Sequence, residues 1–347
     1  MTTKVILDHG ATLERISSIL TKYEHKVGLD NLEFIGAVPG TDTITTLPST
    51  FPEGDYRYKV CTTVKKGKRE GKRLIDIVSE NSFTYRSAES YYGSKSCRAV
   101  NAVEKAENSW IMPFSFKNEH INNLLVLYSM AFWTGCVNYG YVEVNPCQYN
   151  KDALDRCLGG LGNLSFSVHN DVYYITDTSL SRELALLGLP LQQGKKASIR
   201  DFNMPWFVDF MFGNHFKDDS MQRIEEFRKI FLYSLLSDRT RNIRCKDSLG
   251  VNLIGSRTKF IGERMVKKVA EQFMMTFNDM QLSDNDFLTD RVYKNRPPSK
   301  QRFENRIYLR RQNMHTLIKS FTGKFDYESL PHVEVKRLAG QELCGFL

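Results

Sequence analysis

Two similar stretches organise the sequence, Leu127-Tyr-Ser-Met-Ala-Phe-Trp-Thr-Gly-Cys-Val and Phe231-Leu-Tyr-Ser-Leu-Leu-Ser-Asp-Arg-Thr. In both, apolar residues recur at helical spacing, which predicts helices over 119–135 and 221–236. A helix that is apolar over most of its surface has to be buried in the core of a domain. We therefore expect these two helices to form the centre of the fold.

Each of the two stretches also carries short side chains four positions apart near its end. Ala131 and Gly135 have this spacing in the first stretch, and Ser234 and Asp238 have it in the second. Residues four apart lie on one face of a helix, and small residues there let two helices approach closely. We expect the two helices to pack together with their C-terminal ends at one point.

The segments that follow the two helices repeat the same order of elements, about 100 residues apart. Periodicity and turn signals predict strands and then another helix in each block. The predicted elements are a strand over 139–144, a helix over 152–161, strands over 164–168 and 172–175 and a helix over 180–187 in the first block, and a strand over 251–254 and a helix over 258–277 in the second. This order indicates a weak internal duplication.

Composition restricts the class of protein. The chain has 347 residues, which suggests about two domains, and its 41% hydrophobic content is too high for a disordered chain. No apolar run is long enough to span a membrane, and no secretory signal is visible at Met1. The seven cysteines form no CxxC pair and the seven histidines are dispersed, so we expect free thiols in a reducing compartment, cytoplasmic or nucleoid-associated, and no zinc motif.

The net charge of +8 is concentrated in three segments. Basic side chains interleaved with aromatic rings suit phosphate neutralisation on nucleic acid, whereas the alternative for each segment is a solvated turn or linker. The basic residues are Lys65, Lys66, Lys68, Arg69, Lys72 and Arg73 in the first segment, Arg239, Arg241, Arg244 and Lys246 in the second, and eight residues between 291 and 311 in the third, among them Arg302, Arg306 and Arg310.

The N-terminal third of the chain, up to about residue 113, is predicted to be rich in strands. A short apolar run over 4–7 precedes a turn signal. The segments 58–64 and 73–78 are interpreted as the two strands of a hairpin around the Gly-punctuated basic loop.

The two quoted stretches resemble the paired motif helices of LAGLIDADG homing endonucleases. Three further segments resemble parts of that family, namely Thr178-Ser-Leu-Ser-Arg-Glu-Leu-Ala-Leu-Leu-Gly-Leu, Gly255-Ser-Arg-Thr-Lys-Phe-Ile-Gly-Glu and Met204-Pro-Trp-Phe-Val. The flanks resemble the splicing (Hint) module of inteins, in which Thr3-Lys-Val-Ile-Leu-Asp-His-Gly would open the fold, Ile77-Val-Ser-Glu-Asn-Ser-Phe would follow, and Val333-Glu-Val-Lys-Arg-Leu-Ala-Gly-Gln-Glu-Leu-Cys would form a closing strand pair.

The resemblance implies an α+β protein with three segments. Residues 1–115 and 286–347 would form a Hint-like β module, into which a pseudo-two-fold LAGLIDADG-like domain, 116–285, is inserted. It also implies a monomer that binds duplex DNA, with residues after each motif helix on the DNA-facing surface. To the basic residues given above this adds Arg257 and Lys259 as DNA contacts.

The resemblance implies an Mg²⁺-dependent endonuclease only where carboxylates close the motif helices. In this sequence the first such position is Cys136, and the second falls on Arg239, or on Asp238 if the helix end shifts by one residue. Thiol and guanidinium groups are poor Mg²⁺ ligands, so Asp238 is the remaining metal and catalytic candidate. Asn81 stands where the splicing module has a histidine, so protein splicing is not expected.

Two other functions remain open from the sequence. A catalytically inactive module could serve as a subunit of a larger assembly, for example a viral transcription or particle complex, with protein partners in place of DNA. The same surface could also bind structured RNA as a splicing cofactor. Duplex DNA binding with possible nicking activity is the function that we expect.

Overall fold

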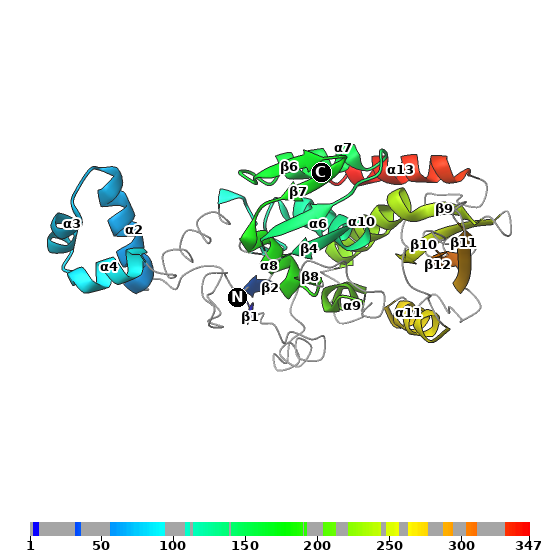
Figure 1. The fold of residues 1–347 in the computed structure, drawn as a ribbon, viewed down its shortest axis with the longest axis horizontal. Coiled ribbons are helices and arrows are strands. Elements are labelled where there is room, and N and C mark those ends of the chain that lie inside the picture. The colour runs from blue at the N-terminus through cyan, green and yellow to red at the C-terminus, as the bar shows by residue number, and fades with distance from the viewer. Residues whose placement is uncertain are drawn as a thin grey trace.

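The structure is a computed structural model of the 347-residue chain (Figure 1). It describes residues 3–6, 32–35, 56–93, 108–111, 114–138, 140–189, 191–192, 204–212, 221–243, 248–256, 263–276, 287–293, 303–310 and 330–347. Helices and strands are mixed in it, so the expected α+β class is confirmed at that level. No helix in the described part of the chain is long and apolar enough to cross a membrane.

The first predicted block is present with its elements in the expected order. They are α6 (Ile121–Thr134), β4 (Gly135–Asn138), β5 (Tyr141–Val144), α7 (Lys151–Gly159), β6 (Phe166–His169), β7 (Val172–Ile175) and α8 (Thr178–Leu186). With the short β8 (Leu191–Gln192), the strands form one sheet in the order β6-β7-β5-β4-β8. Asn170 and Asp171 both have positive φ, as a two-residue hairpin turn requires, and this explains the predicted strand pair.

The second block repeats the topology of the first. Its elements are α10 (Met221–Arg239), β9 (Thr240–Ile243), β10 (Ser248–Ser256), α11 (Glu263–Thr276), β11 (Phe287–Tyr293) and β12 (Phe303–Arg310). The sheet order is β11-β12-β10-β9, so in both blocks the third strand lies at one edge, followed by the fourth, second and first. The predicted duplication is therefore confirmed at the level of topology.

This sheet changes the interpretation of the basic segment between residues 286 and 311. We expected it to return to a Hint-like module, but β11 and β12 pair with each other, and β12 pairs antiparallel with β10. The prediction was wrong because two strands of the second block, β11 and β12, follow α11 and join the same sheet as β10. Strands of one sheet share a core, so 287–293 and 303–310 belong with the second block.

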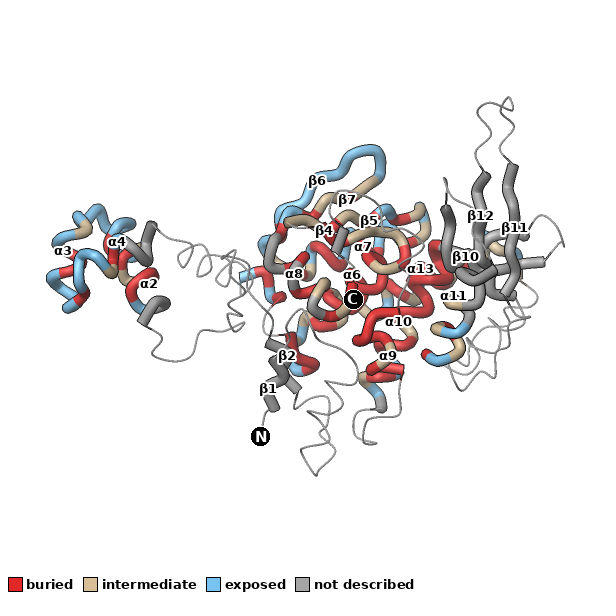
Figure 2. Tube along the Cα trace, turned by 60° about the horizontal axis from the view of Figure 1, so that its bottom comes forward, coloured by how far each residue is buried: buried red, intermediate tan, exposed pale blue. Residues whose placement is uncertain are grey.

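The core of both blocks is the pair of central helices. The indole Nε1–H of Trp133 in α6 donates to the backbone oxygen of Phe231 in α10, at 3.1 Å. The rings of Phe132 and Phe231 stack at 5.6 Å between centroids. Both helices are buried over most of their length (Figure 2), as their apolar surface predicts. Truncation of the buried side chain of Trp133 or of Phe231 to alanine would lower the free energy of unfolding by about 3–5 kcal/mol.

The interval that we interpreted as a β-hairpin is helical. It contains α2 (Tyr56–Arg69), α3 (Leu74–Glu80) and α4 (Tyr85–Gly93). These helices share a small core of their own, formed by Val60, Val64, Ile77, Val78, Phe83 and Ala88. The hairpin prediction failed because residues four apart, such as Val60 and Val64, fit a helix face as well as a strand.

The predicted strand pair near residue 333 is also wrong, because His332–Cys344 forms helix α13. Its buried residues Val335, Ala339 and Leu343 recur every four positions, which is the helical period. The helix packs against α10, α7 and β9, so it contacts both blocks. Of the three segments that resemble a Hint module, the one that begins at Thr3 contains a strand, whereas those at 77 and at 333 begin in helices α3 and α13.

A small three-stranded sheet completes the described structure. It contains β1 (Thr3–Ile6), β2 (Leu32–Ile35) and β3 (Phe114–Ser115), with β1 parallel to β2 and β3 antiparallel to β2. The first strand coincides with the apolar run predicted near residue 4. Phe114 on β3 is buried, and its ring meets the ring of Phe207 at 5.6 Å in an edge-on contact. Phe207 lies on α9 (Trp206–Phe212), so β3 is attached to the main core.

Candidate nucleic-acid interface

The two central helices end at equivalent points, and each passes directly into a strand. Helix α6 ends at Thr134 and α10 ends at Arg239, and β4 and β9 begin at the next residue. Cys136 is therefore the second residue of β4, not a residue at the end of a helix. Its counterpart in the second block is Arg241, the second residue of β9.

The predicted role of Gly135 in helix packing is wrong, because it is the first residue of β4. A Cβ atom at this position would lie 1.9 Å from the backbone oxygen of Glu143 and 3.2 Å from Cα of Ala131. The missing side chain therefore lets β4 leave the helix and pair with β5 at close range. Gly135 is a requirement of the helix-to-strand junction.

Asp238 lies in the last turn of α10 and is 8% exposed. Its surroundings include the thiol of Cys147, whose Sγ donates to the backbone oxygen of Ser237 at 3.1 Å. Burial raises the pKa of Cys147, while the charge of Lys336 lowers it and the charge of Asp238 raises it further. Both charged groups therefore lie near this thiol.

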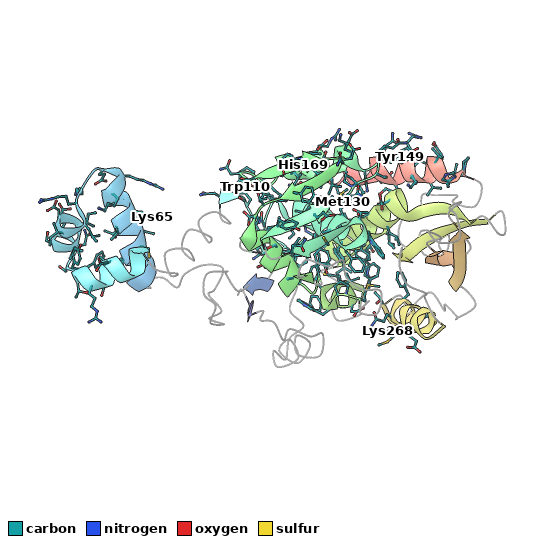
Figure 3. All side chains as sticks on the ribbon, in the orientation of Figure 1. Lys65, Trp110, Met130, Tyr149, His169 and Lys268 are labelled. Carbon is teal, nitrogen blue, oxygen red and sulfur yellow. The ribbon has the colours of Figure 1, made fainter. Side chains whose placement is uncertain are left out.

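Sequence analysis did not identify Lys336 as a residue of this site, although it lies in a part of α13 where apolar residues recur at helical spacing. It is only 5% exposed, and its ammonium lies 5.7 Å from the centre of the Tyr149 ring. Helix α13 approaches this loop closely, since a Cβ on Gly340 would lie 1.9 Å from the backbone oxygen of Tyr149 (Figure 3 labels Tyr149). The C-terminal end of α10 thus has a buried cation near its one carboxylate.

The side chains at the two helix ends do not form a set of ligands suited to the Mg²⁺ ion that the family resemblance implies. The ion prefers several oxygen ligands in octahedral geometry. The hydroxyl of Thr134 at the first helix end donates to the backbone oxygen of Met130 at 3.0 Å, and Cys136 offers sulfur. Asp238 has Lys336 nearby, and no group of three His, Cys, Asp or Glu side chains gathers among the described residues.

One row of residues crosses the sheet of the first block. The strand register aligns Cys136 with Glu143, Glu143 with Tyr174, and Tyr174 with Ser167. The Cys136 thiol donates to a Glu143 carboxylate oxygen at 3.7 Å. All four residues are at least partly exposed, while their strand neighbours Val142 and Tyr173 are buried. This row therefore lies on the outer face of the sheet.

Aromatic groups extend this outer face. The ring of Tyr174 lies 6.0 Å from the ring of Tyr141 and 5.9 Å from that of His169, which Figure 3 labels on β6. The pKa of Tyr141 is raised, first by burial and then by the neighbouring Cys136 and Glu143. The Tyr141 phenol consequently stays protonated and can donate a hydrogen bond. This surface offers rings and hydroxyl groups, with Glu143 as its acid.

The sheet of the second block carries basic residues in the corresponding rows. The register aligns Arg241 with Gly250 and Gly250 with Arg310, so the two arginines share one row. Arg306 lies four positions before Arg310 on β12 and therefore on the same face. Of the other predicted DNA contacts, Arg239 closes α10, whereas Arg244, Lys246, Arg257, Lys259 and Arg302 lie outside the described residues.

The remaining predicted contacts belong to a different part of the chain. Lys65, Lys66, Lys68 and Arg69 lie on α2, and Lys72 and Arg73 lie in the turn before α3. This three-helix unit has its own core, distinct from the core of the two blocks. Those predicted basic residues that the structure describes therefore fall into two groups, one at the end of α10 and on the sheet of the second block, and one in the helical unit.

Comparison with known proteins adds no assignment, since no family model matches the chain and no curated protein matches its sequence.

Proposed function

We propose that the chain binds duplex DNA through the sheets of its two blocks and does not cleave it. The observation that supports this function best is the repeated helix-strand-strand-helix-strand-strand topology with one strand order in both blocks. The central helices of the repeat pack side by side, as the resemblance to LAGLIDADG endonucleases implies. A pseudo-two-fold pair of sheets presents two similar surfaces to two successive parts of one duplex.

The two sheets carry different side chains and would therefore make different contacts with DNA. Arg241, Arg306 and Arg310 on one face of the second sheet would neutralise phosphates, which is the main source of affinity for duplex DNA. Tyr141 and Tyr174 on the first sheet would donate hydrogen bonds to phosphates or base edges. The target would then have no two-fold symmetry.

Salt dependence of DNA binding tests the proposal. Fluorescence anisotropy of the full chain with labelled duplex should give an affinity that falls steeply with salt, by about 0.9 in logarithmic slope for each phosphate contact. The double variant Arg306→Ala/Arg310→Ala should lower that slope by about 2. Lys151→Ala, an equal charge change per residue at an exposed position on α7, is the matched control. A slope unchanged by the double variant would refute the role of this sheet.

Absence of cleavage is tested separately on the same DNA. Supercoiled plasmid carrying the selected target is incubated with the chain and Mg²⁺ or Mn²⁺, and nicked and linear products are separated. We expect neither product, because Asp238 is the one carboxylate described at the helix ends and Lys336 lies near it. Efficient cutting that Asp238→Ala abolishes would contradict the proposal and restore Asp238 as a metal ligand.

A second candidate function, as a subunit of a larger assembly, is supported by one edge strand. Strand β6 is the outer strand of the first sheet, and its apolar residues Phe166 and Val168 are 46% and 43% exposed. An exposed apolar edge is a site where another chain can add a strand. Phe166→Lys should leave duplex affinity unchanged and abolish a protein contact there.

Competition with structured RNA in the anisotropy assay distinguishes a role in RNA binding.

A further inference from the structure

Helices α3 and α4 are joined by a four-residue turn and contact each other. Helix α3 has seven residues, Leu74–Glu80, and α4 has nine, Tyr85–Gly93. Two short helices joined by a turn of three or four residues, with a third helix behind them, are the elements of a helix-turn-helix module. Whether this unit can act as such a module depends on how the turn is fixed and on which residues of α4 are exposed.

The turn is held by a specific backbone arrangement. Ser82 has φ 57°, the left-handed conformation that ends many helices. The Phe83 amide donates to the backbone oxygen of Val78 at 3.2 Å, and both side chains are buried in the same cluster. This bond and this apolar contact form a Schellman motif, which fixes the direction in which the chain leaves α3.

The start of α4 is also fixed. Thr84 caps the helix, since its Oγ1 accepts a hydrogen bond from the Ser87 amide at 3.1 Å. Ala88 is buried against the core of the unit, while Tyr85 is 47% exposed and Arg86 and Glu89 are exposed as well. The first turn of α4 therefore presents a ring and a guanidinium outward from a rigid base.

Helix α2 supports the pair at close range. A Cβ atom on Gly67 would lie 2.6 Å from Cδ1 of Ile77, so the glycine allows α2 and α3 to touch. Gly71 has φ 79° and ends α2, with the Lys72 amide donating to the backbone oxygen of Gly67 at 2.9 Å. The three helices thus form one packed unit with a defined orientation of α4.

The unit is strongly basic. Residues 56–93 contain nine Lys and Arg against four Asp and Glu, a net charge of +5. Two of the basic residues are paired, Arg73 with Asp76 at 2.9 Å and Lys72 with Glu80 at 2.6 Å. Of the described basic side chains, Lys66, Lys68, Arg69 and Arg86 have no ion-pair partner.

We propose that residues 56–93 are a helix-turn-helix module that binds duplex DNA, with α4 in the major groove. Tyr85 and Arg86, at the start of α4, would reach base edges, and arginine there forms two hydrogen bonds to guanine. The unpaired basic residues at the end of α2 would contact the flanking phosphates. The proposal does not rest on the two sheets, because the module has a core of its own and would bind DNA even if they do not.

Selection of duplexes by the full chain tests the module. Wild-type protein and the double variant Tyr85→Ala/Arg86→Ala are each used to select from a random duplex library. The duplexes selected by the wild type should share two separate segments of preferred base pairs. Those selected by the double variant should lose the preference in one segment and keep it in the other. On the wild-type target, the double variant should bind about tenfold more weakly or worse. A thermal melt shows that each variant is folded.

Two comparisons separate this proposal from the function of the sheets. Arg306→Ala/Arg310→Ala should weaken binding without changing the segment that depends on α4, and Lys151→Ala controls for the loss of a surface charge. A Tyr85→Ala/Arg86→Ala protein that selects the full wild-type target with unchanged affinity overturns the module, whatever the sheets do. If the α4 variant loses its segment while the sheet variant binds as the wild type does, the module stands and the sheet proposal fails.

Discussion

A buried carboxyl group on α8 makes the stability of the protein depend on pH. Glu183 is 2% exposed, and neither of its carboxyl oxygens has a hydrogen-bond partner in the described part of the chain. Burial raises its pKa from the usual 4.5 to about 8. An ionised carboxylate without a partner is costly in an apolar interior, so Glu183 is protonated at neutral pH in the folded protein.

The direction of the pH dependence follows from the two pKa values. Between about 4.5 and about 8 the folded chain holds this proton and the unfolded chain releases it, so the free energy of unfolding falls as the pH rises. The effect is complete above the folded pKa and absent below the unfolded one. One pKa unit corresponds to about 1.4 kcal/mol, which gives about 5 kcal/mol over the whole window and about 3 kcal/mol between about pH 5 and about pH 7.5.

The isosteric variant Glu183→Gln isolates this effect. Urea unfolding of both proteins under reducing conditions, at several pH values in this window, gives the difference in free energy of unfolding between variant and wild type. We expect that difference to shift in favour of Glu183→Gln by about 3 kcal/mol as the pH rises, because the amide does not ionise. Glu119→Gln, at a side chain that is 87% exposed, controls for the loss of one carboxyl group. A difference that stays constant within about 1 kcal/mol would refute the reasoning.

Three further predictions concern single positions. Gly135→Ala should prevent stable folding or destabilise by several kcal/mol, because its Cβ would meet a backbone oxygen at 1.9 Å that cannot move aside; thermal melting measures this, and an unchanged melt would mean that the junction tolerates a side chain. Ser82→Gly should stabilise the three-helix unit by about 1 kcal/mol, since glycine adopts a positive φ without strain; slower amide exchange in 56–93 is the expected sign, and faster exchange would contradict it. Cys157 is buried and its thiol pKa is raised by that burial, so iodoacetamide should label it only after unfolding; peptide mapping that finds it modified in the folded chain would show that α7 opens.

The central helices and the first block were predictable because their signals are local and strong. Apolar residues surround α6, and Asn170 with Asp171 is a turn signal that fixes the neighbouring strands. The central strand β5 and helix α7 also matched their predicted ranges closely. Where one short segment contains both its pattern and its boundary, sequence alone is sufficient.

The errors arose where the meaning of a residue depends on a distant partner. Gly67 was interpreted as part of a loop, but it lies within α2. A glycine is needed at this helical position because the side chain of Ile77 occupies the space beside it. Gly71 is a true helix end, so one glycine of the basic run marks a boundary and the other does not. Sequence spacing cannot distinguish these two roles, since the difference lies in tertiary packing.

The candidate site was predictable in its elements but not in its residues. The end of the first helix was located within one residue and that of the second within three, yet the strand begins at Gly135, so Cys136 belongs to the sheet. The charge near Asp238 comes from Lys336, almost 100 residues later, on a helix that was interpreted as strands. No local pattern connects these two residues. The unpaired carboxyl of Glu183 was equally invisible, because a glutamate in a helix is ordinary until its burial is known.

The repeated topology within one chain has a consequence for how its surface can change. In a protein assembled from two identical subunits, every substitution occurs twice and must suit both copies. Here the matching positions are encoded separately, so Thr134 and Arg239 can differ, as can Cys136 and Arg241. One copy can therefore accumulate cations while the other accumulates tyrosines, and neither change disturbs the central helices that both copies share.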